Sequence, residues 1–508
     1  MKQLLVANTK KAIADKIPLI LLIGIIGIGF VYRLVNILQN VSYWNDENNV
    51  TIYARALIDH GKPLTASGYS TGLYQSAMYF VTALSFKLFG VTEFAGRLPS
   101  ILVGTFLTIA VYFVTKKLFE NNAALIAAFL TTFLQIQLAW STQLRPYIWL
   151  QLFTVVIVYY SYKFAVNKTK FIDINFVIAA MLSVLAVLFH ATALMNMFII
   201  GLSVGYKALK QKKYIYLIGP IVLLFLIFAM VYSFSSNSIK GVTQLLLSYN
   251  TDILHYFVFI THNYLWLFAG ASIGIYPTWR KNRELAYILS ASISIIFFLA
   301  IFKINSQYVR YSLSAFPLVY ILFGNGLVWL IKRTKTYIPL KQNNIFTSIL
   351  ILSIFFIFPL YKGKIVLLPQ KYYSINADVR ENPVPNYKSA FEKINTLIEG
   401  KKNIIIMDAW NDRVPWYLPN HKYIFLNGFK TNDIDPVFGE KQISTIKAFN
   451  KEKSKYRSGI VIVENWESQT PEYLKNYIKT TLKHEFDQGT VPGNEKDPWD
   501  ISVYSWGL

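Results

Sequence analysis

Residues 17–38 read IPLILLIGIIGIGFVYRLVNIL, and after five intervening residues comes Trp44-Asn45-Asp46-Glu47-Asn48-Asn49. The first stretch is long enough to cross a bilayer as an α-helix, which takes roughly 20 apolar residues. It begins late in the chain and lacks a small-residue cleavage site, so we expect a retained helix with a cytoplasmic N-terminus and not a cleaved signal peptide. The whole chain has the composition of a polytopic membrane protein, because 54% of its 508 residues are hydrophobic and 16% are aromatic.

Similar apolar stretches recur along the first two thirds of the chain and predict an α-helical polytopic membrane protein with about eleven spans. Lys and Arg gather in alternate loops, as at Lys10 with Lys11 and at Lys116 with Lys117, and such an excess marks cytoplasmic loops. The formal net charge of +23 therefore reflects membrane topology and does not indicate a nucleic-acid partner. The predicted spans cover residues 17–38, 98–115, 122–140, 146–162, 173–189, 191–206, 214–234, 262–278, 285–302, 311–331 and 345–361.

An odd number of spans from a cytoplasmic N-terminus places the rest of the chain on the external side. We expect a transmembrane domain over 1–366, including a first external loop at 39–97, and an external (periplasmic) domain over 367–508 in a bacterial inner (plasma) membrane. The run from Gly72 to Phe89 is apolar enough to span. A crossing there would invert every later loop and break the charge rule, so we expect an interfacial helix.

The C-terminal segment differs from the rest, because its charges nearly balance and its apolar runs are short. Runs typical of β-strands occur at 404–407, 423–426 and 459–463, and helical stretches at 387–398 and 472–482 alternate with them. This alternation predicts a soluble α/β domain with a partly parallel sheet.

Acidic residues are scarce before residue 367, where nine of the chain's 27 lie, and Asp46-Glu47 is the only adjacent acidic pair among them. The expected topology puts this pair outside, directly after the first span. A carboxylate held there can act as general base toward the hydroxyl of an acceptor. The pair also fits a helix N-terminus, with Asn45 or Asp46 as the N-cap of a helix that continues through Leu57, and the two interpretations are compatible.

The motifs of the first loop resemble a known family. Asp46-Glu47, Gly61-Lys62-Pro63-Leu64 and the run FGVTEFAGRLPS at 89–100 are similar to the first external loop of the dolichyl-phosphate-mannose protein mannosyltransferase-like glycosyltransferases. This is family 39 of superfamily C, and the lipid A aminoarabinose transferases are related to it. Further similarities are Arg145-Pro146-Tyr147, His190 and Arg310-Tyr311, so the resemblance extends over 17–331.

The resemblance implies an inverting hexosyl- or pentosyltransferase. Such an enzyme moves a sugar from a polyprenyl-phosphate carrier to a lipid, glycan or protein acceptor on the external face of the membrane. Asp46 takes the role of catalytic base or acceptor-orienting group, and Glu47 a supporting catalytic role. The chain departs from many relatives in having no second carboxylate shortly after Arg145, which puts a two-carboxylate mechanism there in doubt.

Basic residues at the external ends of spans are the candidates for binding the single phosphate of such a donor. For most of them, snorkelling toward the membrane interface is the alternative. His190 equally fits a hydrogen-bonded turn, and no cluster of metal-ligand residues is apparent, so no metal ligand is assigned and a divalent ion is left as an alternative. The candidates are Arg97, Arg145, Lys303 and Arg310 for the phosphate, and His190, Tyr147, Tyr311 and Glu93 for substrate.

Two other classes of function fit a chain of this composition. A transporter or flippase of lipid-linked glycans usually carries charges within its spans or inverted repeats. A membrane scaffold without catalysis would not need Asp46-Glu47, so substitution of Asp46 separates it from an enzyme. The partners expected for the enzyme are the lipid bilayer, a polyprenyl-phosphate sugar and an acceptor.

Overall fold

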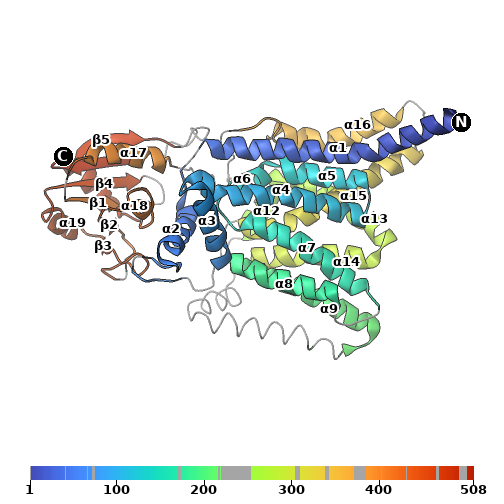
Figure 1. The fold of residues 1–508 in the computed structure, drawn as a ribbon, viewed down its shortest axis with the longest axis horizontal. Helices are drawn as coiled ribbons and strands as arrows, with labels where there is room; N and C mark the ends of the chain where they lie inside the picture. The colour runs from blue at the N-terminus through green and yellow to red at the C-terminus, as the bar shows by residue number, and fades with distance from the viewer. Residues whose placement is uncertain are drawn as a thin grey trace. The chain divides into compact units, whose positions relative to one another are not determined.

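Figure 1 shows the fold of the chain in a computed structural model. The chain forms two compact units. Unit 1 comprises Met1–Val35, Gly72–Ala77 and Ser100–Glu381, and unit 2 comprises Asn36–Thr71, Met78–Pro99 and Asn382–Leu508. Most of the predicted first external loop thus groups with the C-terminal domain and not with the helices of unit 1. The described residues are 2–39, 42–65, 67–70, 75–168, 173–214, 218, 253–303, 309–337, 343–370, 385–401, 403–430, 432–464, 468–490 and 500–508.

Unit 1 is built from helices, which Figure 1 shows running alongside one another. Each predicted span on described residues coincides with one helix or with two consecutive ones, whereas the span at 214–234 lies almost wholly outside the described residues. The helices are α1 (Lys2–Leu38), α4 (Glu93–Leu118), α5 (Asn121–Phe133), α6 (Gln135–Ser141), α7 (Tyr147–Val166), α8 (Ile174–Phe189), η1 (Ala191–Leu194), α9 (Met195–Gln211), α12 (Ile253–Asn263), α13 (Leu265–Lys281), α14 (Arg283–Phe298), η3 (Leu299–Lys303), η4 (Val309–Ala315), α15 (Phe316–Tyr337) and α16 (Asn343–Tyr361).

Within the described part of the chain, six helical segments are long and apolar enough to cross a membrane, so the protein is a multi-pass membrane protein. The pair α12 and α13, bent by 86° at its break, would make a seventh. The helices at 121–133, 174–189 and 351–361 are apolar but shorter, so the predicted number of about eleven spans is not confirmed. The six segments are Lys16–Leu38, Glu93–Leu118, Tyr147–Val166, Ala191–Gln211, Arg283–Lys303 and Val309–Thr334.

Close packing of α13 on α15 depends on glycine. A Cβ added at Gly274 would lie 2.0 Å from the carbonyl oxygen of Leu322, and one at Gly326 would lie 2.4 Å from the carbonyl oxygen of Gly270. Small residues let membrane helices approach until their backbones touch. This contact fixes α15, which continues directly from the η4 segment that carries Arg310.

Unit 2 contains α2 (Asn45–His60), α3 (Ser76–Phe89) from Met78 onward, and one six-stranded sheet in the order β3-β2-β1-β4-β6-β5. Strands β3, β2, β1 and β4 pair in parallel with one another in that order, while β6 pairs antiparallel with β4 and β5, which confirms the predicted partly parallel sheet. The strands are β1 (Ile404–Asp408), β2 (Tyr423–Leu426), β3 (Lys441–Ile443), β4 (Ser458–Glu464), β5 (Lys483–Gln488) and β6 (Ile501–Trp506), and the helices are α17 (Tyr387–Ile398), α18 (Arg413–Tyr417), α19 (Ile446–Lys453) and α20 (Glu472–Thr481).

Both faces of the sheet are covered by helices. Ile404 and Ile406 of β1 pack with α17 and α18, whereas Ile405 and Met407 pack with α19 and α20. Successive side chains of a strand point to opposite faces, so the same alternation directs Asp408 to the α17 and α18 side. Glu464, at the end of β4, falls on that side for the same reason, and two carboxylates thus end adjacent parallel strands.

Candidate active site

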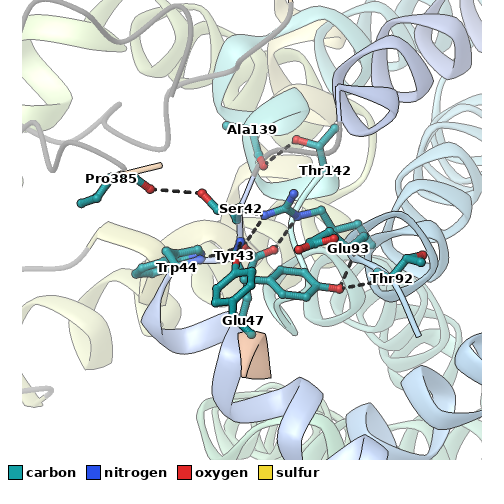
Figure 2. A network of polar contacts seen from close by, with 11 residues as sticks. Ser42, Tyr43, Trp44, Glu47, Thr92, Glu93, Ala139, Thr142 and Pro385 are labelled. Carbon is teal, nitrogen blue, oxygen red and sulfur yellow. Dashed lines mark hydrogen bonds and ion pairs between the residues drawn. The ribbon is translucent and has the colours of Figure 1, made fainter. Parts of the chain in front are cut away.

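Helix α2 begins directly after Trp44, whose backbone is extended (φ −98°, ψ 171°). The Trp44 N–H donates to Oε2 of Glu47 at 3.3 Å (Figure 2). An acidic side chain in the third helical position often folds back in this way and accepts a hydrogen bond from the backbone N–H of the N-cap residue. Asp46 and Glu47 both lie in the first turn, where the helix dipole favours negative charge. The N-cap is therefore Trp44, and the prediction of Asn45 or Asp46 is wrong because both already lie inside the helix.

Glu47 forms a two-pronged ion pair with Arg97. Nε of Arg97 donates to Oε1 at 2.8 Å and Nη2 donates to Oε2 at 2.6 Å, while Nη2 also donates to the carbonyl oxygen of Ser42 at 3.0 Å. The side chain of Glu47 is 0% exposed and that of Arg97 is 7% exposed. The pair thus joins the first turn of α2 to the first turns of α4 in a site that water does not reach.

Tyr43 completes this network. Its ring lies 4.8 Å from Cζ of Arg97, a cation–π distance, and its hydroxyl donates to the carbonyl oxygens of Thr92 and Glu93 at 3.2 Å (Figure 2). Burial raises the pKa of Tyr43 well above its ordinary value, so the hydroxyl stays a donor. The Glu93 side chain pairs with Lys388 at 3.4 Å. Sequence analysis did not single out Tyr43, because an aromatic residue after a span also fits a membrane-interface belt.

Asp46 differs from Glu47 in exposure. It is half-buried, whereas Glu47 is fully buried, and the two side chains leave the helix about 100° apart. A general base has to come within hydrogen-bond distance of an incoming hydroxyl. Of the two carboxylates, Asp46 is the more exposed.

A second group of predicted residues converges in unit 1 around Tyr147, the buried first residue of α7. Cζ of Arg145 lies 5.6 Å from the centre of the Tyr147 ring, and Cζ of Arg310 lies 5.9 Å from it. The ring of Tyr311 lies 6.1 Å from the same ring. Segments more than 160 residues apart thus bring two guanidinium groups to one aromatic side chain.

His190 borders this group, with its ring 5.5 Å from that of Tyr147. It lies between α8 and η1, where its Nδ1 accepts from the backbone N–H of Thr192 at 3.2 Å and lies 2.9 Å from the Thr192 hydroxyl. An accepting Nδ1 places the proton of a neutral imidazole on Nε2. His190 is therefore a hydrogen-bonded turn residue, and its binding of substrate stays a prediction. Lys303 is half-buried at the end of η3.

The comparisons with known proteins agree with this arrangement. Residues 77–234 match the family model described as dolichyl-phosphate-mannose-protein mannosyltransferase. ArnT from Cupriavidus metallidurans bound to undecaprenyl phosphate is similar in structure, with a TM-score of 0.61 and 12% identity over 95% of this chain and 97% of that one. The fold of this chain is therefore similar to the fold of ArnT. The resemblance found in the sequence is thereby confirmed.

Two structures of an archaeal protein are similar as well. The apo oligosaccharyltransferase of Archaeoglobus fulgidus gives a TM-score of 0.57 at 14% identity, over 88% of this chain and 70% of that one. Its complex with an inhibitory peptide and a dolichol-phosphate gives 0.55 at 13%, over 87% and 69%. No curated protein matches the chain by sequence.

The predicted site residues fall into two groups. Asp46, Glu47, Glu93 and Arg97 belong to unit 2, and the residues around Tyr147 belong to unit 1. Among the described residues, no three His, Asp or Glu side chains gather closely enough to hold a metal ion.

Proposed function

We propose that the protein is an inverting glycosyltransferase that moves a sugar from a polyprenyl-phosphate carrier to an acceptor hydroxyl. The fold supports a lipid-linked donor, since similar structures hold undecaprenyl phosphate or dolichol phosphate. The acceptor is a lipid, a glycan or a protein on the external face of a bacterial inner membrane, with the N-terminus cytoplasmic and 367–508 periplasmic. The observation that carries the proposal is the convergence of two guanidinium groups on Tyr147.

Arg145 and Arg310 bind the phosphate of the donor. Two guanidinium groups present fixed arrays of N–H donors, which suit the oxygens of one phosphate. As the bond between the sugar and the phosphate breaks, negative charge grows on the departing oxygen. Donors placed before the reaction stabilise that charge most effectively in a site that excludes water.

Asp46 receives the proton of the acceptor. The acceptor oxygen attacks the anomeric carbon while its proton passes to the carboxylate of Asp46, and polyprenyl phosphate leaves with the electron pair of the broken bond. Attack from the side opposite the phosphate inverts the configuration at that carbon. The first turn of α2 holds Asp46 in a fixed orientation, which supports this role.

Arg97 and Glu47 take a different role from those expected from the sequence. Their two short hydrogen bonds and deep burial support a structural pair that holds the start of α2. We assign them this positioning role in place of phosphate binding by Arg97 and catalysis by Glu47. Glu93, through its contact with Lys388, supports the same loop.

The test compares Asp46→Asn with Asp59→Asn in the full-length protein. Asp59 is a matched control, because it lies on the same helix but is exposed and pairs with Arg55 at 3.5 Å. General-base assistance contributes about 10²- to 10⁴-fold, so Asp46→Asn should lower turnover by that factor and Asp59→Asn should not. Turnover is measured as release of polyprenyl phosphate from lipid-linked sugars extracted from source membranes, with undecaprenyl phosphate binding as the check on folding. Near wild-type turnover in Asp46→Asn would remove Asp46 from the mechanism.

A further inference from the structure

A buried arginine lies within the first membrane-spanning helix of unit 1. Arg33 belongs to the part of α1 that is long and apolar enough to cross a membrane, Lys16–Leu38, and it is only 1% exposed. A charged side chain inside a membrane span is costly, and where one occurs it usually has a function. The proposed transfer reaction does not use Arg33, so its role has to be found in what it contacts.

Arg33 connects α1 with the end of α6. Its Nε donates to the hydroxyl of Ser141, the last residue of α6, at 2.7 Å, and its Nη1 donates to the carbonyl oxygen of Gly29 at 3.0 Å. Gly104 of α4 leaves room for this contact, because a Cβ there would lie 3.1 Å from Nε of Arg33 and 2.6 Å from Cβ of Ser141. The guanidinium thus holds α6 where three helices meet.

Helix α6 needs such contacts because it is short and separated from α5. The two helices are divided at Leu134, whose backbone is extended (φ −66°, ψ 132°), and α6 itself has seven residues. Its first residue is held by the backbone, since the N–H of Gln135 donates to the carbonyl oxygen of Lys364 at 2.9 Å. At its other end, Arg33 holds the side chain of Ser141.

Helix α6 also contacts both elements that carry the guanidinium groups of the proposed phosphate site. The ring of Trp140 lies 5.0 Å from the ring of Tyr147, on which those groups converge, at an angle of 79°. Nε2 of Gln137 donates to the hydroxyl of Tyr320 at 2.8 Å. Tyr320 lies on α15, which continues directly from the η4 segment that carries Arg310. The position of α6 therefore bears on both sides of the site.

We propose that Arg33 is a positioning residue for the donor phosphate, which it affects through α6. The inference rests on the proposed function. By holding Ser141, Arg33 fixes the end of α6, which lies four residues before Arg145, and α6 in turn sets the separation of Arg145 and Arg310. Two guanidinium groups can share one phosphate only at a separation that lets both reach its oxygens. A displacement of about 1 Å in such a group can cost about a hundredfold in rate.

The test compares Arg33→Met with Tyr162→Phe in the full-length protein in detergent. Titration with undecaprenyl phosphate should show about tenfold weaker binding for Arg33→Met. Tyr162→Phe is the control, because it also removes a hydrogen bond between helices, the one from Asn282 at 2.7 Å, but about 22 Å along α7 from Tyr147. Its affinity for undecaprenyl phosphate should stay that of the wild type.

Two measurements separate positioning from a loss of stability. In Arg33→Met, the Ser141 hydroxyl keeps its hydrogen bond to the carbonyl oxygen of Leu138 at 3.1 Å, so the unfolding temperature should not fall. In an Arg145→Gln background, Arg33→Met should weaken binding much less than it does alone, because the group that it positions is already gone. Ser141→Ala, which removes the acceptor and keeps the arginine, should weaken binding in the same direction, and it decides the question if Arg33→Met does not fold.

Wild-type affinity in folded Arg33→Met or in Ser141→Ala would overturn the positioning role. An equal loss with and without Arg145 would overturn it as well, since Arg33 would then act independently of that residue. If Arg145→Gln and Arg310→Gln both bind undecaprenyl phosphate as the wild type does, the proposed phosphate site fails and the inference fails with it. If Arg145→Gln binds weakly while Arg33→Met binds normally, only the role of Arg33 is lost.

Discussion

Removal of the Arg97 guanidinium should destabilise the first loop far more than removal of an exposed one. In Arg97→Gln, the carboxylate of Glu47 loses hydrogen bonds of 2.6 and 2.8 Å at a site where its side chain is 0% exposed. A buried charge left without its partner costs about 3–5 kcal/mol. The apolar pair Arg97→Met with Glu47→Leu should recover most of that loss, because neither charge then has to be desolvated.

Hydrogen exchange of the full-length protein in detergent measures this effect as the free energy of local opening of α2. The matched control is Arg55→Gln, which breaks an exposed pair to Asp59 on the same helix and should cost at most about 1 kcal/mol. An Arg97→Gln protein whose α2 exchanges no faster than that of Arg55→Gln would refute the reasoning. So would a double apolar variant as unstable as the single one.

Three further outcomes are expected. Arg145→Gln should weaken binding of undecaprenyl phosphate by about 1.5–3 kcal/mol, measured by titration, whereas exposed Lys332→Gln should leave it unchanged. Burial and neighbouring Glu464 raise the pKa of Asp408 well above its ordinary value, so the folded state keeps a proton that the unfolded state releases, and stability falls as pH rises above about 4. Asp408→Asn should therefore raise the unfolding temperature at pH 7 and change it little at pH 4, and equal shifts at both would contradict this. Cysteines introduced at Ser67 and Ser389 should both react with an impermeant thiol reagent in spheroplasts, and protection of one alone would mean that α3 crosses the membrane.

Local patterns predicted much of the fold. The run at 404–407 became β1 and the stretch at 387–398 became α17, because burial follows directly from apolar periodicity. Strand β5, with the sequence KHEFDQ, was not predicted, because it is polar and largely exposed and so lacks the apolar pattern of a buried strand. Its pairing with β6 cannot be inferred from local sequence. The predicted number of about eleven spans is not confirmed, because several apolar runs in the described residues form helices shorter than a bilayer.

The candidate site shows the same division. The scarcity of acidic residues before residue 367 pointed to Asp46. The order of the motifs along the chain pointed to Arg145 and Arg310 as members of one site. The partner of Arg97 could not be predicted, because Glu47 lies 50 residues earlier and no local pattern joins the two positions. The burial of Asn48 could not be predicted either, since an asparagine beside an acidic pair looks like part of a solvated helix start.

The interleaved construction of unit 2 makes the protein's maturation depend on the order of its synthesis. Ser42 donates to the carbonyl oxygen of Pro385 at 3.1 Å, and the N–H of Tyr43 donates to the hydroxyl of Tyr417 at 3.2 Å, across 343 and 374 residues of chain. At about 5–20 residues per second, the ribosome needs roughly 20 to 70 s to supply those partners. The loop that carries Asp46 thus leaves the ribosome among the first segments and acquires its native contacts among the last, so a truncated nascent chain would already be inserted in the membrane but catalytically silent.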